Sequence, residues 1–178
     1  LVNSLAPENA KLHYCHISST DSFPAMKQGS TFEVAPHHLF LSYETAKNAA
    51  DTHMRMNPPL REESERKRLL AAFDKIDVIA SDHAPHTITE KSAEFASAPS
   101  GIPGVETMLP LLMNEVHAGR MNLNAVIEKT VTNPNRILGI ESPAFMPGAR
   151  ADFAVYAKSP IKIDAENLHS KCGWSPYE

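Results

Sequence analysis

Short β-prone runs alternate with longer helical segments over most of the chain, and this order restricts the folds that it can adopt. The β-prone runs cover residues 11–17, 30–36 and 77–81. The spacing of apolar residues and the presence of helix-capping residues predict helices over residues 42–51, 62–76, 105–119, 123–131 and 134–139. Strands that alternate with helices are typical of a parallel sheet with crossover helices. We therefore predict an α/β fold.

The segment after Met146 has a different character. Its residues PGARADFAVYA predict a turn and then a strand, and no crossover helix follows. We therefore expect two units, with residues 1–140 in the α/β fold and residues 141–178 forming the start of a small β domain.

Composition argues against several classes of function. The 178 residues carry a net charge of −4 with both signs interspersed, so no basic surface for nucleic acid or membrane is expected. No apolar run approaches the ~20 residues that span a bilayer, and no signal-peptide pattern opens the chain. Two cysteines, Cys15 and Cys172, make a poor disulfide framework at this length, so we expect a cytoplasmic protein.

Each β-prone run is followed by side chains that can bind a metal ion. These are Cys15 and His16 after the first run, His37 and His38 after the second, and Asp82 and His83 after the third. Singly, each has an ordinary structural explanation, such as a turn residue or a helix cap. Because the carboxyl ends of parallel strands meet at one edge of a sheet, their recurrence favours a metal or acid–base site there.

Alternation of side chains along a strand helps to choose between neighbouring candidates. It predicts that His13 and His16 face opposite ways. His16 lies nearer the functional edge and is the better ligand, whereas His13 is expected to pack against helices. Cys15 is expected to be a small buried residue, although a thiolate beside a metal ligand could bind a further ion.

Several segments together resemble the dihydroorotases, a family of the amidohydrolase superfamily of metal-dependent TIM-barrel hydrolases. They are LHYCHISS, EVAPHHLFL, NPPLR, ASDHAPHT, GIPGVETMLPLL, TNPNRILGI and KCGWSPYE, and they occur in the family's order. PHHLFL, NPPLR and SDHAPHT favour dihydroorotases over the hydantoinases and allantoinases that share the fold. The resemblance implies zinc-dependent, reversible hydrolysis of the cyclic amide of L-dihydroorotate to N-carbamoyl-L-aspartate, a step of pyrimidine biosynthesis.

The resemblance also implies roles for single residues. His16 and Asp82 would bind zinc, and Asp82 would carry the proton from the attacking water to the leaving nitrogen. The substrate would be held by Asn57 at its ring, by His86 at its carboxylate and by the backbone of Ser100 and Gly101. Cys15 and Glu33 are weaker candidates, as ligands of an additional metal. The family assigns no role to His83, which we expect to support the metal ligands. We expect His37 and His38 to be structural, because a buried imidazole can fix the loop backbone.

The chain departs from the family pattern in one large respect. It has no HxH motif, and the substrate-binding Arg, the bridging Lys or Asp and the further His of the family are also missing. The full family enzyme holds two zinc ions, for which His16 and Asp82 alone are too few ligands. A TIM barrel needs about 250 residues, so we expect roughly its strands six to eight with their helices. The chain would then be the C-terminal part of a longer protein and inactive alone.

Two other functions stay open. One is a non-catalytic, dihydroorotase-like chain that supports a transcarbamoylase, and the other is a related cyclic amidase, either a hydantoinase or an allantoinase. The presence of His16, Asp82 and His86 favours an enzyme, because a purely structural chain does not need a proton carrier or a carboxylate anchor. We expect a homodimer, which a transcarbamoylase could join.

Overall fold

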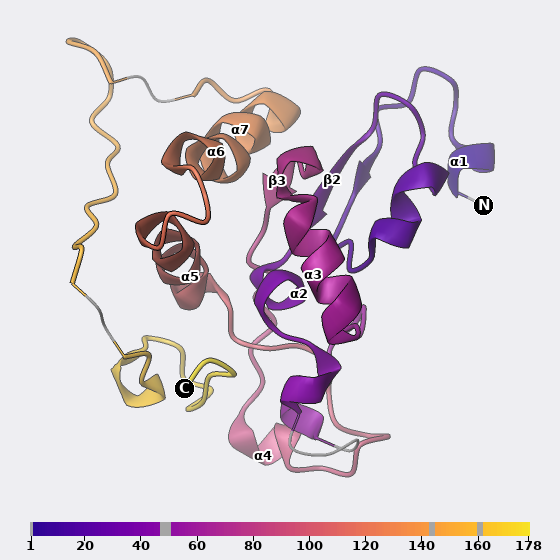
Figure 1. Cartoon of the computed structure of the whole chain (residues 1–178), viewed down its shortest axis with the longest axis vertical. Coiled ribbons are helices and arrows are strands. Elements are labelled where there is room, and N and C mark those ends of the chain that lie inside the picture. The colour runs from indigo at the N-terminus through magenta and orange to yellow at the C-terminus, as the bar shows by residue number, and fades with distance from the viewer. Residues whose placement is uncertain (1, 47–50, 143–144, 160–161) are drawn as a thin grey trace.

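The computed structural model describes residues 2–46, 51–142, 145–159 and 162–178 (Figure 1). Its sheet has three short strands in the order β1 (His13–Tyr14), β2 (Thr31–Val34) and β3 (Val78–Ile79). Both strand pairs are parallel, with His13 opposite Thr31 and Glu33 opposite Val78. The predicted parallel α/β arrangement is confirmed.

Helices occupy the segments before, between and after the strands. They are α1 (Val2–Leu5), α2 (Pro36–Phe40), α3 (Glu63–Ala71), α4 (Ile88–Lys91), α5 (Val105–His117), α6 (Leu123–Ile127) and α7 (Asn133–Leu138). A π-helical stretch, Glu128–Thr132, joins α6 to α7. Single 3-10 turns lie at Thr20–Ala25, Tyr43–Thr45, Thr52–Met54, Phe73–Lys75 and Ala165–Asn167. In Figure 1, α2 and α3 lie beside the sheet, and α4 lies apart from it.

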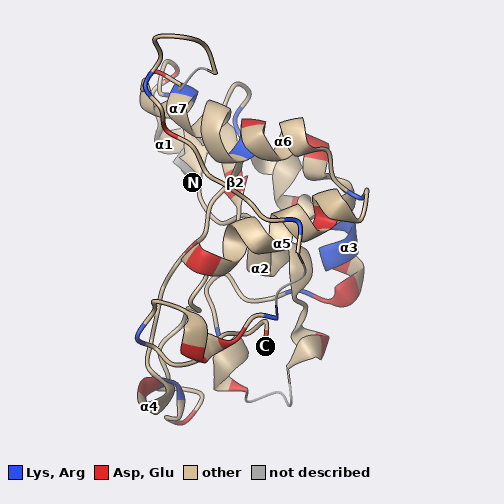
Figure 2. Ribbon diagram, turned by 90° about the vertical axis from the view of Figure 1, so that its left-hand side faces the viewer, with Lys and Arg blue, Asp and Glu red and all other residues tan. Residues whose placement is uncertain are grey.

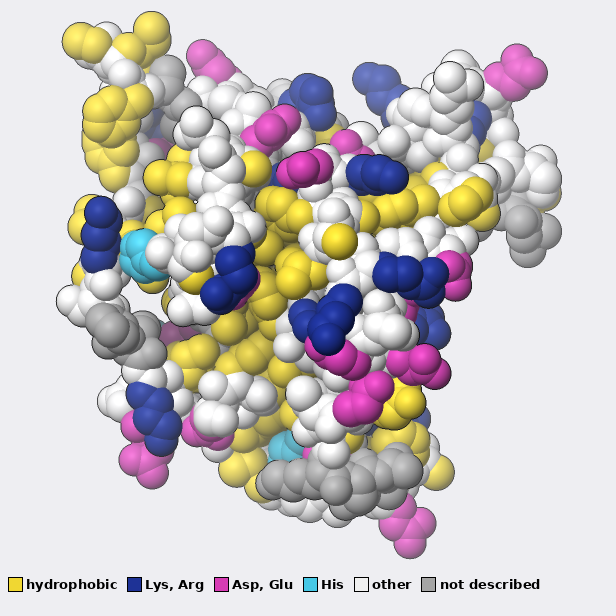
Figure 3. Space-filling model, viewed as in Figure 1, with side chains coloured by type: hydrophobic (Ala, Val, Ile, Leu, Met, Phe, Trp, Pro, Cys, Tyr) yellow, Lys and Arg dark blue, Asp and Glu magenta, His cyan; other side chains and the backbone are white. Residues whose placement is uncertain are grey.

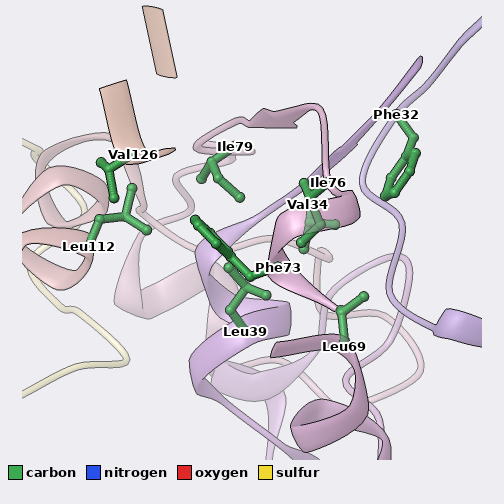
Figure 4. Packing of buried hydrophobic residues seen from close by; sticks show 9 residues of the cluster. All are labelled: Phe32, Val34, Leu39, Leu69, Phe73, Ile76, Ile79, Leu112 and Val126. Atoms are coloured by element: carbon green, nitrogen blue, oxygen red, sulfur yellow. The ribbon is translucent and has the colours of Figure 1, made fainter. Parts of the chain in front are cut away.

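The main hydrophobic core lies between the sheet and these helices (Figure 4). Strand β2 contributes Phe32 and Val34, which are buried together with Leu39 of α2, Leu69 of α3 and Leu112 of α5. A second, smaller core joins the loops that follow the strands to the C-terminal segment. It contains Leu41, Met56, Leu60, Ile102, Cys172 and Trp174. These contacts hold the loops against the C-terminal segment.

Two predicted helices differ from those observed. The prediction for residues 42–51 is replaced by the single turn Tyr43–Thr45, and its residues 47–50 lie outside the described part. The helix predicted over residues 62–76 ends at Ala71, and a 3-10 turn continues it to Lys75. The chain leaves helical geometry after this 3-10 turn, and Ile76, which follows it, is buried in the main core just before β3.

The strand predicted after Met146 is not formed in residues 145–159, where the structure shows no helix or strand. This segment runs along the outer side of α5 and α6 in Figure 1, and the ring of Tyr156 lies 5.3 Å from that of His117 on α5. A strand needs a neighbour to accept its backbone hydrogen bonds, and the described residues provide none here. The division of the chain near residue 140 stays a prediction.

The surface has mixed charge, as the sequence indicates. Lys and Arg are interspersed with Asp and Glu along the ribbon in Figure 2, and hydrophobic side chains gather across the centre of the face in Figure 3. Among the described residues, every helix is too short or too polar to cross a bilayer.

Candidate metal and substrate site

The carboxyl ends of β1 and β3 have an unusual backbone conformation at the two predicted metal ligands. His16 has a φ of 41° and Asp82 a φ of 45°, and these are the non-glycine residues with positive φ in the described ranges. Such a conformation costs on the order of 1–3 kcal/mol and persists where surrounding structure enforces it, which is often at functional sites. At both positions the positive φ interrupts the extended backbone, so the alternation of side chains between the two faces of the sheet does not continue through them.

His16 and Asp82 share one electrostatic environment with Glu33. Partial burial raises the pKa of the Asp82 carboxyl, His16 lowers it and the Glu33 carboxylate raises it. His16 Nδ1 is buried and has no hydrogen-bond partner within the described part of the chain. An unpartnered imidazole nitrogen near a carboxyl group whose pKa is raised by burial fits a divalent cation, which would satisfy the nitrogen and stabilise the carboxylate.

His13 lies on the same face of the sheet as Glu33, contrary to the prediction that it packs against helices. Its Nε2 is 3.1 Å from Glu33 Oε2, and its Nδ1 is 2.8 Å from Thr31 Oγ1. The prediction was wrong because alternation was extended from His13 to His16, past the end of β1 at Tyr14 and through a positive φ. The helix-facing positions are instead those of Phe32 and Val34.

His13, Cys15 and Glu33 form a compact donor cluster, with ligand atoms that all lie within 4.8 Å of one another. The sequence predicts a buried Cys15, but its side chain is exposed. Desolvation raises the pKa of this thiol, and Glu33 beside it and then Asp82 raise it further. These groups therefore favour the protonated thiol. A cation bound between them would have the opposite effect and favour the thiolate.

The two histidines after β2 have different surroundings. His38 is buried and its Nε2 donates to the carbonyl of Pro58 at 3.1 Å, which fixes the loop backbone as predicted. His37 lies with its Nε2 3.6 Å from Asp82 Oδ2, so it borders the candidate metal site. The sequence did not predict this contact, because the number of residues between His37 and Asp82 does not show how closely α2 packs against the end of β3.

His83 makes a structural contact through its Nδ1, and the support of metal ligands that was expected of it stays a prediction. Its Nδ1 accepts hydrogen bonds from the backbone N–H groups of Gly104 and Val105, at 3.1 and 3.3 Å. These are among the N–H groups that a helix cannot satisfy internally at its first turn. His83 therefore caps α5 and ties it to the end of β3.

The predicted substrate residues lie on loops that contact one another. His86 Nε2 donates to the carbonyl of Ser100 at 3.1 Å, and its Nδ1 lies 4.0 Å from Glu90 Oε2. The N–H of Gly101 donates to the carbonyl of Arg55 at 3.0 Å, which brings this loop beside the one that carries Asn57. Asn57 itself is exposed. The structure thus brings His86, Ser100 and Gly101 together, with Asn57 on the adjoining loop.

Gly101 allows a close approach of two of these loops. Its φ is 126°, and a Cβ built on it would lie 2.5 Å from Ala84 Cβ and 2.8 Å from Ala84 O. We expect Gly101→Ala to lower the free energy of unfolding by about 3 kcal/mol, because it adds a backbone clash to an unfavourable φ. Urea unfolding measures this loss.

Gly29→Ala is the matched control for Gly101→Ala. Gly29 also has a positive φ, of 78°, but an added Cβ would meet nothing within 4 Å. Its substitution should cost only the φ penalty of about 1 kcal/mol. Equal losses in the two variants would show that the loop contact with Ala84 is unimportant.

Curated relatives match nearly all of the chain, although no family model does. The dihydroorotase of Archaeoglobus fulgidus is 44% identical over 96% of the chain and 42% of its own length. The dihydroorotase of Pyrococcus furiosus is 40% identical over 100% of the chain and 43% of its own length. The chain therefore spans about two-fifths of the length of the relatives that it matches.

Solved structures with the same fold are hydantoinases. The D-hydantoinase of a Thermus species superposes with a TM-score of 0.82 at 22% identity, over 99% of this chain and 42% of that one. The L-hydantoinase of Arthrobacter aurescens gives a TM-score of 0.82 at 25% identity, over 95% and 41%. Taken with the sequence matches, this makes the chain a homologue of the dihydroorotases across nearly all of its 178 residues, with the α/β fold that is also found in the hydantoinases.

Proposed function

We propose that the chain is the C-terminal part of a zinc-dependent dihydroorotase, contributing about strands six to eight of its TIM barrel. The proposed reaction is the reversible hydrolysis of the cyclic amide of L-dihydroorotate to N-carbamoyl-L-aspartate. The observation that carries the proposal is the convergence of His16, Glu33 and Asp82 at the carboxyl ends of parallel strands. That edge is where barrel enzymes hold their catalytic groups.

The donor set suits zinc, for which His16 and Asp82 are the proposed ligands, and Cys15 and Glu33 are candidates for an additional ion. Zinc would supply Lewis acidity, which polarises the amide carbonyl and makes water acidic enough to attack it. Asp82 would accept the proton of that water and pass it to the ring nitrogen as the carbon–nitrogen bond breaks. A carboxyl whose pKa is raised by burial is better suited to this exchange than a fully solvated one.

The substrate loops would hold the carboxylate that the reaction leaves unchanged. The proposed anchors are His86, which can donate to a carboxylate from Nδ1 only when that nitrogen also carries a proton, and the backbone of residues 100–101. Asn57 would contact the ring from the adjoining loop. These contacts would orient the substrate ring so that its amide carbon faces the strand ends. Such orientation by itself increases the reaction rate.

Substrate assays on the complete gene product test this proposal. With zinc bound, we expect turnover of dihydroorotate to exceed that of hydantoin and allantoin. Preference for hydantoin or allantoin would point to another cyclic amidase, which the fold of the hydantoinases also accommodates. Absence of turnover and of bound zinc would point to a structural chain, and co-purification with a transcarbamoylase would then identify its partner. Light scattering tests the proposed homodimer.

A further inference from the structure

Lys91, the last residue of α4, is buried with its ammonium group inside the protein. Its side chain is fully shielded from solvent, with an exposure of 0%. Nζ donates to the backbone carbonyls of Arg55, Pro99 and Gly101, at 3.1, 3.0 and 3.1 Å. An ammonium group has three donors, and all three are used here.

The surroundings of Lys91 keep it charged at neutral pH. Burial lowers the pKa of its ammonium group to about 8, which still leaves the proton in place at pH 7. Nζ also lies 5.6 Å from the centre of the Trp174 ring, a distance at which the aromatic face attracts a cation. Loss of any of these interactions would leave a buried charge without a partner, which is energetically costly. The positions of the three carbonyl groups around Nζ are therefore closely fixed.

The partners of Lys91 belong to the loops that carry the proposed substrate contacts. Pro99 and Gly101 flank Ser100, and Arg55 precedes Asn57 by two residues. Trp174 donates from Nε1 to the carbonyl of His86 at 2.7 Å, which connects the third of these loops. One ammonium group and the ring beside it therefore hold three loops that are distant in the sequence.

We propose that Lys91 is a positioning residue that sets the distance between the loop of Asn57, the loop of Ser100 and Gly101, and His86. This inference rests on the proposed function, because it takes those loops to be the ones that hold the substrate. Lys91 touches neither the reacting atoms nor the proposed metal ligands. Its effect should therefore fall on substrate affinity and leave the chemical step nearly unchanged.

Lys129 provides a matched control for Lys91. It is also buried, it donates to the carbonyls of Asp74 and Ile76, and it lies 5.1 Å from the centre of the Phe73 ring. Its partners precede β3, however, and do not belong to the substrate loops. Removal of either charge should reduce stability, but only Lys91 should affect the binding of substrate.

The test compares Lys91→Met with Lys129→Met in the zinc-loaded, complete gene product. For Lys91→Met we expect KM for dihydroorotate to rise roughly tenfold to a hundredfold, with kcat changed by less than about threefold. For Lys129→Met we expect KM within about twofold of the wild-type value and a lower midpoint of urea unfolding. An unchanged KM in a folded, zinc-loaded Lys91→Met, or an equal rise of KM in both variants, would overturn the inference.

Hydrogen exchange separates this inference from the proposed function. The Gly101 N–H donates to the carbonyl of Arg55, and it should exchange at least about tenfold faster in Lys91→Met and not in Lys129→Met. That result would support the loop role even if the wild-type protein failed to hydrolyse dihydroorotate, and unchanged exchange would refute it. If Lys91→Met does not fold, Trp174→Phe takes its place. It keeps an aromatic ring but removes the bond to His86, so an unchanged KM there would also refute the inference.

Discussion

Asp82→Asn should lower kcat for dihydroorotate by about a thousandfold or more in the complete gene product. The amide keeps the size of the side chain but can neither accept the proton of the attacking water nor deliver one to the leaving nitrogen. It is also a weaker zinc ligand than a carboxylate, so the zinc content of the variant should fall. Steady-state kinetics, with zinc measured by elemental analysis on the same sample, checks both effects.

Asp77→Asn is the control for Asp82→Asn. Asp77 precedes β3, and its Oδ2 accepts a hydrogen bond from the N–H of Phe32 at 3.0 Å, which an amide oxygen can still accept. We expect its kcat to stay within about threefold of the wild-type value. If Asp82→Asn kept more than about a tenth of the wild-type kcat at full zinc loading, another group would have to carry the proton.

The order of the strands could be predicted from sequence, because it depends on local pattern. The same pattern places His16 and Asp82 beyond strand ends, and their role as metal ligands stays a prediction. The apolar run Val78–Ile79 indicates burial on both faces of β3, and Asp82 follows it after two residues; His16 instead lies at the end of an alternating run whose strand β1 is half-buried. The orientation of His13 could not be predicted, because it depends on where β1 stops and on the φ of His16. The 3.6 Å approach of His37 to Asp82 depends on the packing of α2 against the sheet, which no spacing encodes.

Elements that need a distant partner were the least predictable. The segment after Met146 has the composition of a strand, yet it forms none in residues 145–159, where Phe153 and Val155 are 62% and 98% exposed. Strand propensity measures how well a side chain fits a half-buried sheet, and it has no effect where no sheet is present. Lys91 is the opposite case, since its role arises from carbonyl groups that every residue carries and that no motif marks.

The buried histidine pair after β2 makes the protein sensitive to acid. Burial lowers the pKa of His37 to about 2, with further lowering by His38 and His16. Burial also lowers the pKa of His38 to about 4, although its bond to Pro58 acts in the opposite direction. Neither His38 Nδ1 nor His37 Nε2 makes a hydrogen bond within the described residues. A proton added to His38 Nδ1 would be buried without a hydrogen-bond acceptor, whereas His37 Nε2 lies 3.6 Å from Asp82 Oδ2.

The sign of the pH dependence follows from these directions. In the unfolded chain both imidazoles titrate near 6.5, whereas in the folded protein they resist protonation down to about 4 and about 2. Between these values the unfolded state binds more protons, so stability is complete above pH 6.5 and falls as the pH is lowered. Each histidine contributes a slope of about 1.4 kcal/mol per pH unit, and the pair should remove roughly 5 kcal/mol between pH 7 and pH 4.5.

His38→Gln should halve this contribution to the pH dependence of unfolding. Glutamine can still donate to the Pro58 carbonyl but does not titrate, so the slope between pH 6 and pH 4.5 should become shallower by about 1.4 kcal/mol per pH unit. Urea unfolding at a series of pH values measures the slope. If His38→Gln left it unchanged, acid sensitivity would have to come from groups outside the histidine pair.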